Sequence, residues 1–260
     1  MSTHRMPSLF IGHGSPMNAL EDNRHTRAWK ALGESLPKPK GIVAISAHWY
    51  TRGTGVTAMA QPKTIHDFHG FPPALFAQTY AAPGDPVLAS RVQEVLRPTP
   101  VAADQQWGLD HGTWSVLVHL YPQADVPVVQ LSIDATQPAQ YHYELGKKLA
   151  ALRDEGVLIV GSGNVVHNLG VIRWTAGAAP YPWATSFDEQ LRVALERGEH
   201  DFAIHYERAG EAAALSIPTP EHYLPLLYVL GTQSSQDAIS FPTDGIELGS
   251  ISMLAVLIGG

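Results

Sequence analysis

Four histidines that could bind a metal or move protons lie in short motifs spread along the chain. They are His13 in Gly-His-Gly-Ser-Pro, His48 in Ser-Ala-His-Trp, His167 in Asn-Val-Val-His-Asn and His222 in Pro-Glu-His-Tyr-Leu-Pro. Imidazole is the commonest metal ligand in proteins, and its ordinary pKa lies close to neutral pH. The four motifs therefore suggest a single site assembled from distant parts of the sequence.

Apolar segments typical of buried strands precede three of these histidines. Residues 8–11, 41–47 and 157–160 lead toward His13, His48 and His167, and helix-like segments alternate with them at 26–36, 86–96, 137–154 and 186–196. In open α/β sheets, the carboxyl ends of parallel strands line the ligand crevice. We therefore expect these histidines to converge at the strand ends.

The alternation of strands and helices predicts an α/β fold. We expect a single catalytic domain over residues 1–260, with a mostly parallel central sheet, helices on both faces and a metal site at the carboxyl ends of the strands. Thr113 is expected to cap a helix that ends at Leu120. A further helix is expected over 221–230, and strand structure over 246–258.

The composition narrows the chemistry and the partners. The chain has no cysteine, so any metal would be bound by imidazole or carboxylate groups, which suits iron, zinc or manganese. Its formal charge is −7 without a cluster of lysine and arginine, which argues against nucleic acid as a partner. It has neither a membrane-spanning apolar run nor an apolar leader, so we expect a cytoplasmic protein that does not bind membranes.

The third metal ligand could be Glu221 or His222. Adjacent residues in a helix point about 100° apart, so one metal would rarely bind both directly. A carboxylate with His13 and His48 would form the two-histidine, one-carboxylate triad of non-haem iron oxygenases. His222 would give an all-imidazole site that also suits zinc, and the remaining residue of the pair could then orient a ligand.

Two histidines are candidates for acid–base chemistry. His167 could be a fourth metal ligand or a general base, since an unperturbed imidazole can take up a proton near neutral pH. His111, in Asp110-His111-Gly112, is a second acid–base candidate, although a histidine in such a turn can also have a purely structural role.

The motifs resemble those of the class III extradiol ring-cleavage dioxygenases, the family of the protocatechuate 4,5-dioxygenase catalytic subunit, and within it the 4,5-DOPA dioxygenase branch. The resemblance covers nearly the whole chain. The motifs that carry it are Leu-Phe-Ile-Gly-His-Gly-Ser-Pro-Met (9–17), Ser-Ala-His-Trp (46–49), Ile-His-Asp-Phe (65–68), Leu-Asp-His-Gly-Thr-Trp (109–114), Gly-Asn-Val-Val-His-Asn (163–168), Pro-Tyr-Pro-Trp-Ala (180–184) and Thr-Pro-Glu-His-Tyr-Leu-Pro-Leu (219–226).

The resemblance implies a metal-dependent dioxygenase that cleaves the ring of L-DOPA or a related catechol with O₂. It implies one divalent metal per chain, Fe(II) for turnover with Zn(II) as a substitute on isolation, bound by His13, His48 and His222 or Glu221. His167 corresponds to a residue described as a base or as a metal contact, and His111 is the candidate acid. The product would be a muconate semialdehyde, 4,5-seco-DOPA in the case of L-DOPA.

Two other functions are compatible with the same residues. One is a zinc-dependent hydrolase, in which the metal activates water. The other is a non-catalytic metal-binding protein on the same fold, because a fold does not determine a function. For all three, we expect a monomer or a small homo-oligomer.

Overall fold

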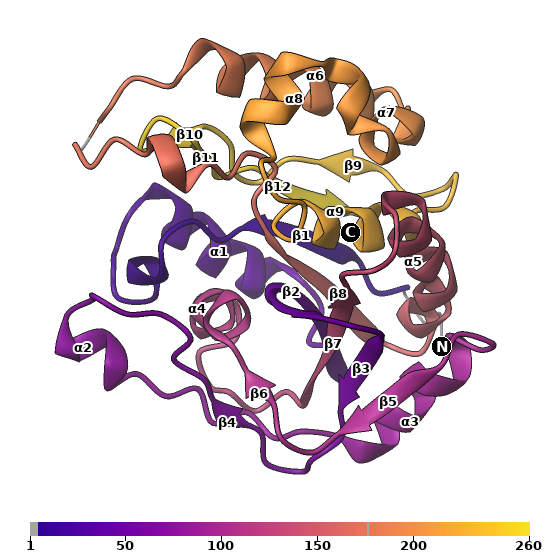
Figure 1. Cartoon of the computed structure of the whole chain (residues 1–260). Helices are drawn as coiled ribbons and strands as arrows, with labels where there is room; N and C mark the ends of the chain where they lie inside the picture. The colour runs from indigo at the N-terminus through magenta and orange to yellow at the C-terminus, as the bar shows by residue number, and fades with distance from the viewer. Residues whose placement is uncertain (1–4, 176) are drawn as a thin grey trace.

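An eight-stranded sheet runs through the centre of the computed structural model, which describes residues 5–175 and 177–260 (Figure 1). The order of its strands is β5-β3-β7-β2-β8-β1-β12-β9. Their bounds are β1 (Ser8–Gly12), β2 (Gly41–Thr51), β3 (Thr54–Thr57), β5 (Val101–Asp104), β7 (Val128–Asp134), β8 (Val157–Gly163), β9 (Ile239–Ser240) and β12 (Ala255–Ile258).

The middle of the sheet is parallel and its margins are mixed. Strands β7, β2, β8 and β1 all run in the same direction, whereas β3 is antiparallel to β7 and β12 is antiparallel to β1. The central strands are continuously apolar because both of their faces are covered. Within β2, Ile42 and Ala44 pack into one core, and Val43 and Ile45 into the other.

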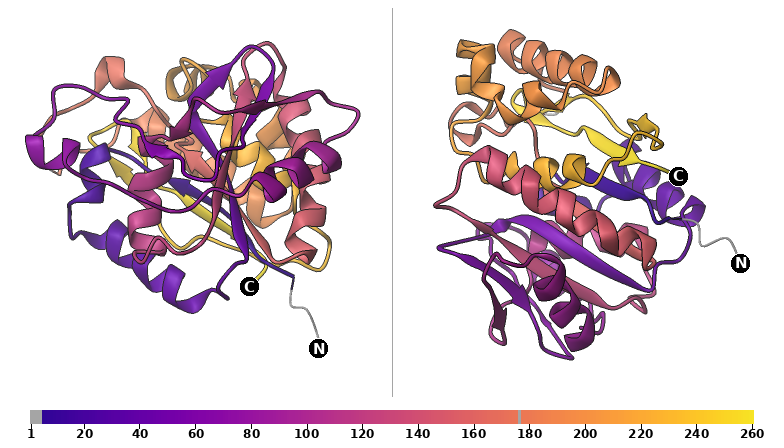
Figure 2. Two further views of the ribbon diagram at one scale, coloured as in Figure 1. Left: turned by 90° about the horizontal axis from the view of Figure 1, so that it is seen from below. Right: turned by 90° about the vertical axis from the view of Figure 1, so that its right-hand side faces the viewer.

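Helices cover the two faces of the sheet as separate layers (Figure 2). On one side are α1 (Arg24–Ser35) and α4 (His111–Leu120), and on the other are α3 (Pro86–Val95), α5 (Ala139–Asp154) and α9 (Leu224–Gly231). A third group, coloured orange in Figure 1, packs beside the C-terminal strands and consists of α6 (Pro182–Glu196), α7 (His200–Ile204) and α8 (Glu211–Ser216). The predicted single-domain α/β architecture is thus confirmed.

Short elements complete the chain. These are β4 (Lys63–Thr64), β6 (Gly108–Leu109), β10 (Ile246–Glu247), β11 (Ile251–Ser252), α2 (Pro73–Phe76) and the 3₁₀ turns η1 (Pro16–Ala19), η2 (Leu169–Val171) and η3 (Tyr206–Ala209). Across the described residues, every helix is too short or too polar to cross a bilayer.

Three predicted boundaries were wrong. Helix α4 begins at His111, because the Asp110 carboxylate accepts a hydrogen bond from the Thr113 amide and so caps the helix in place of Thr113. Helix α9 begins only at Leu224, so the residues at 221 and 222 precede it. The 246–258 segment is divided into β10, β11 and β12, with positive φ angles of 52° at Leu248 and 81° at Gly249 between the first two strands.

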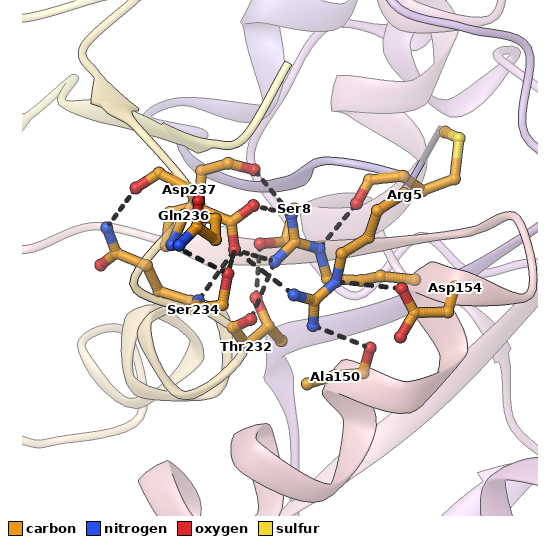
Figure 3. Close-up of polar contacts among 12 residues, drawn as sticks. Arg5, Ser8, Ala150, Asp154, Thr232, Ser234, Gln236 and Asp237 are labelled. Atoms are coloured by element: carbon orange, nitrogen blue, oxygen red, sulfur yellow. Dashed lines mark hydrogen bonds and ion pairs between the residues drawn. The ribbon is translucent and has the colours of Figure 1, made fainter. Parts of the chain in front are cut away.

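A buried ion pair joins the chain ends at the edge of the sheet opposite the carboxyl ends of its parallel strands. The fully buried Arg153 guanidinium donates to both carboxylate oxygens of Asp237, at 2.8 and 3.0 Å. It also donates to the carbonyl groups of Met6, Thr232 and Ile258. Figure 3 shows Asp237 within this network, with Arg5 beside it. We call Arg153 and Asp237, with these three carbonyl groups, the terminal clasp.

Candidate metal centre

Three imidazoles meet where β1, β2 and the turn before α9 approach one another. His13 directly follows β1, and His222 lies two residues before α9. His48 was expected just after its strand, but it lies within β2, in the stretch between Ile45 and Tyr50 where the pairing with β7 shifts register. One ligand nitrogen from each of the three rings lies within 4.8 Å of the others.

Hydrogen bonds determine which nitrogen of His13 is free. The Ser162 hydroxyl donates its only proton to the Gly112 carbonyl at 2.5 Å, because a carbonyl can only accept. The same hydroxyl lies 2.9 Å from Nδ1 of His13, so it must accept a proton from that atom. His13 is therefore the Nδ1–H tautomer, and its Nε2 lone pair is available to a metal.

The other two imidazoles are oriented in the same way by carboxylates. Nδ1 of His48 lies 3.3 Å from Asp67, and Nδ1 of His222 lies 3.2 Å from Glu221. A carboxylate favours a proton on the nearby ring nitrogen, which leaves Nε2 of each ring unprotonated. The Nε2 atoms of His13 and His48 are 3.3 Å apart, so a shared cation would relieve the repulsion of their lone pairs.

The environment of Glu221 suits an orienting residue. Its Oε1 atom accepts from the Thr219 hydroxyl at 2.8 Å and lies beside Nδ1 of His222. Its carboxylate clusters with His167 and His222, whereas the imidazole cluster contains His13, His48 and His222. Because Glu221 and His222 lie in a turn, the helical-angle argument does not apply, and the geometry favours His222 as the third nitrogen donor.

His167 lies against the site without joining the imidazole cluster. Its ring stacks on that of His222, with centroids 3.5 Å apart and planes 8° from parallel. Burial lowers the pKa of His167 to about 4. The expected imidazole pKa near neutrality was therefore wrong for this ring, because desolvation of the charged form keeps it neutral throughout the physiological range.

His111 faces the site from the first turn of α4. Its ring centroid is 3.9 Å from that of His48, and its Nδ1 lies 2.9 Å from Asp67. The Asp67 carboxylate also accepts the backbone amide of His111 at 2.9 Å. Asp67 therefore connects His48 with His111 and can balance a positive charge on either ring. Asp110, the sequence neighbour of His111, instead caps α4 and bonds Gln130.

Burial also keeps the three clustered imidazoles neutral. It lowers the pKa of His13 and of His222 well below the ordinary value, and neighbouring histidines add to the effect. For His48, burial and the nearby His111 outweigh the Asp67 carboxylate and lower the pKa to about 3. Neutral imidazole is the form that binds metals, so the site would not have to lose protons when a cation binds at neutral pH.

A cavity of about 390 Å³ opens over the histidines. All five histidines discussed above contribute to its wall, and the apolar part includes Phe68, Phe71, Leu248 and Ile251. The lining therefore combines apolar side chains, which suit contact with an aromatic ring, with imidazole nitrogens.

Asp67 and Ser162 contact the candidate ligands but were not predicted as site residues. Asp67 belongs to a loop 44 residues before His111, and no periodic pattern connects the two. Ser162 lies in the Gly-Ser-Gly tripeptide at the end of β8. Such a tripeptide does not by itself indicate one function. A search for oxygen acceptors beside each predicted ligand could have included both, but only the folded chain shows which histidine each one contacts.

Residues 7–255 match the family described as the catalytic LigB subunit of aromatic ring-opening dioxygenase. With this fold and these clustered imidazoles, the chain belongs to that family and is an oxidoreductase of the dioxygenase class.

Individual relatives agree with this membership. The chain is 58% identical to the 4,5-DOPA dioxygenase extradiol of Escherichia coli K12 over 264 residues, covering 100% of this chain and 97% of the relative. It is 41% identical to the protein of the same name from Beta vulgaris, covering 86% and 85% of the two chains. A crystal structure of an uncharacterized Escherichia coli K12 protein superposes with a TM-score of 0.86 at 54% identity, covering 98% of this chain and 100% of that one.

Proposed function

We propose that this protein is an Fe(II)-dependent extradiol dioxygenase that opens the catechol ring of L-DOPA, or of a closely related catechol, between carbons 4 and 5. The observation that carries the proposal is the set of three imidazoles whose Nδ1 atoms each face an oxygen and whose remaining nitrogens converge. Family membership supports the reaction class, and the names of the two relatives support the substrate.

In this proposal His13, His48 and His222 bind one divalent metal. Three nitrogen donors suit Fe(II) and also Zn(II), which would fill the same site in protein isolated without iron. Bound iron would supply the electron transfer between catechol and O₂ that zinc, with a single accessible oxidation state, cannot supply.

The remaining histidines would move protons. His167 is neutral and stacks on a proposed ligand, so it can accept a catechol proton at the metal-facing end of the cavity. His111 would return a proton during ring opening, with Asp67 balancing the charge on its ring. Phe68 and Ile251 would pack against the aromatic ring and keep water from it.

Anaerobic loading of the metal-free protein with one Fe(II) per chain tests the function. After addition of L-DOPA and O₂, we expect one O₂ to be consumed for each semialdehyde formed. An oxygen electrode measures the O₂ consumption, and visible absorbance measures the semialdehyde. A Zn(II)-loaded sample should neither consume O₂ nor form the semialdehyde. If no catechol consumes O₂ while iron is bound, the proposal fails, and turnover with zinc in the absence of O₂ would indicate the hydrolase instead.

His167→Ala tests the assignment of this residue as a base. We expect kcat to fall roughly 10²- to 10⁴-fold, because proton transfer from the catechol loses its acceptor, while metal content and KM change little. Metal analysis and steady-state kinetics measure the two effects, with His205→Ala, a partly exposed histidine outside the site, as the control. Loss of the metal would show that His167 is a ligand.

A cytoplasmic location and a monomeric or small homo-oligomeric state stay predictions.

A further inference from the structure

A second cavity adjoins the one above the imidazoles. Its volume is about 430 Å³, and the two cavities share five lining residues, Gly14, Ser15, Trp174, Leu248 and Ile251. At its wall lie Arg24 and His25 from the start of α1 and Glu247 from β10. The first cavity is largely apolar apart from its histidines, whereas the lining of the second includes both a fixed cation and a carboxylate.

Arg24 lines this cavity without a close carboxylate partner. Its guanidinium contacts Nε2 of His25 at 3.2 Å, the Asp244 carbonyl at 3.3 Å and the Glu247 carboxylate at 3.5 Å. Good arginine–carboxylate contacts are about 2.7–2.9 Å long and often bidentate. Arg27, one turn further along the same helix, reaches Asp22 with two bonds of 2.7 and 3.0 Å. The Arg24 side chain is 62% exposed, so a ligand can reach it.

The hydrogen bonds around His25 cannot all form together. Its Nε2 atom receives the Nε–H of Arg24 and also lies 3.1 Å from the Glu247 carboxylate, which can only accept. Burial lowers the pKa of His25, so the ring is neutral near pH 7 and Nε2 can either donate or accept. An added carboxylate that bound Arg24 would let His25 donate to Glu247, and every group would then have a suitable partner.

We infer that Arg24 and Glu247 bind the amino acid end of the substrate, Arg24 its α-carboxylate and Glu247 its α-ammonium group. The inference rests on the proposed function, which places the catechol ring over the imidazoles. A side chain extending from that ring past Ile251 and Trp174 would enter the second cavity, because those residues line both cavities. Arginine suits this role because its planar fork matches the two oxygens of a carboxylate.

The opposite charges explain why a zwitterion fits better than a plain acid or amine. Glu21 also lines the second cavity, so two carboxylates and one guanidinium surround the space. A ligand with a carboxylate but no amine would be repelled by the two carboxylates of the cavity. A ligand with an amine but no carboxylate would be repelled by Arg24. An α-amino acid presents both charges on one carbon and can satisfy both sides.

Anaerobic binding to the Zn(II)-loaded protein tests this assignment without turnover. Isothermal titration would compare four catechols: L-DOPA, 3-(3,4-dihydroxyphenyl)propionate without the amine, dopamine without the carboxylate, and 4-methylcatechol with neither. The wild-type protein should bind L-DOPA most tightly.

Two variants divide the roles. Arg24→Gln should weaken the binding of L-DOPA and the propionate roughly ten- to hundred-fold, the range expected for loss of a charged hydrogen bond, and should not weaken the binding of dopamine or 4-methylcatechol. Glu247→Gln should instead weaken L-DOPA and dopamine, by roughly tenfold. Arg27→Gln, an exposed arginine on the same helix that lines neither cavity, should leave all four affinities unchanged.

The outcomes separate the two proposals. Equal weakening of all four catechols by Arg24→Gln would show a merely structural role and overturn the inference, as would wild-type protein that binds 4-methylcatechol as tightly as L-DOPA. Either result leaves the dioxygenase assignment intact if the iron-loaded protein consumes O₂ with a catechol. Conversely, selective L-DOPA binding without O₂ consumption by the iron-loaded protein would support this site and refute the proposed reaction.

Discussion

At the scale of single residues, the candidate metal centre depends on oxygens that lie behind the imidazoles. Ser162, Asp67 and Glu221 each face the Nδ1 atom of one histidine. These contacts select the tautomer and hold the ring plane, and one ligand nitrogen from each ring lies within 4.8 Å of the others.

Ser162→Ala would remove one of these oxygens. His13 would lose the acceptor for its Nδ1 proton, and its ring could adopt the other tautomer, which offers no lone pair on Nε2. We expect metal affinity to fall roughly 10- to 100-fold, measured by competition with a chelator of known affinity. Ser115→Ala is the matched control, because within the described part of the chain the buried Ser115 hydroxyl has no partner. Similar losses in both variants would contradict the tautomer argument.

The residue types of the centre were predictable, and their pairings were not. His13, His48 and His222 could be selected from sequence because strand ends and short motifs surround them. Which oxygen meets which ring depends on loops, and Asp67 is a clear case because it contacts both His48 and His111 from a segment without regular structure. The lowered pKa values of the histidines could not be predicted from the sequence either, because they are caused by burial in the folded protein.

At the scale of elements, apolar patterning located the central sheet well. The strongly apolar strands β2 and β8 and the long helix α5 were predictable within a few residues, because a buried segment leaves a clear apolar pattern. The short helices α7 and α8 were not predicted, since each is held by packing against α6 more than by its own periodicity.

Helix α6 has a carboxyl group on its packed side that should make stability depend on pH. Burial raises the pKa of Asp188 to about 6, although the Ser252 hydroxyl donates to it. The folded state therefore favours the protonated carboxyl. Its contribution to stability is fully present below the unfolded-state pKa, about 3.9, and is lost as pH rises through about 6.

Asp188→Asn should remove the loss of stability that accompanies ionisation of the buried carboxyl, while keeping an acceptor for the Ser252 hydroxyl. We expect the variant to match the wild-type protein near pH 4 and to be more stable at pH 8, by up to about 3 kcal/mol. Urea unfolding at several pH values measures the difference. Glu189→Gln, at the exposed neighbouring position, should show no such trend. A constant difference at every pH would rule out the titration of Asp188 as the cause.

At the scale of the whole molecule, the terminal clasp holds the end of the sheet opposite the candidate metal centre. Arg153 lies in the last turn of the long helix α5 and donates to carbonyl groups just before β1, just after α9 and at the end of β12, which are far apart in sequence. Burial alone would raise the pKa of Asp237, but hydrogen bonds from Arg153 and Ser234 outweigh it and lower the pKa to about 2.

Asp237→Asn should lower the free energy of unfolding of the whole protein and leave its catalytic activity unchanged. Removing one partner of a buried pair costs roughly 3 kcal/mol or more, because the arginine charge stays buried. Urea unfolding would show the loss of stability.

In the wild-type protein this stabilisation by Asp237 is present above the unfolded-state pKa of about 3.9 and is lost as pH falls through about 2. Asp154→Asn, which removes only an exposed contact with Arg5, should cost less than about 1 kcal/mol. Equal losses would show that the clasp is not the source of stability.

Main-chain contacts give the metal centre a property of its own. The His13 amide donates to the Gly163 carbonyl at 3.0 Å, and the Asn164 amide donates to the His222 carbonyl at 2.8 Å. A side chain at position 163 would collide with that His222 carbonyl, so glycine permits the close approach. The backbone thus places two of the imidazoles through bonds that involve no ion. Under the proposed assignment of His13, His48 and His222 as ligands, the main chain would hold the donors at the same spacing whichever ion is offered, so the metal content of a preparation would depend on the ions supplied to it as well as on their affinities.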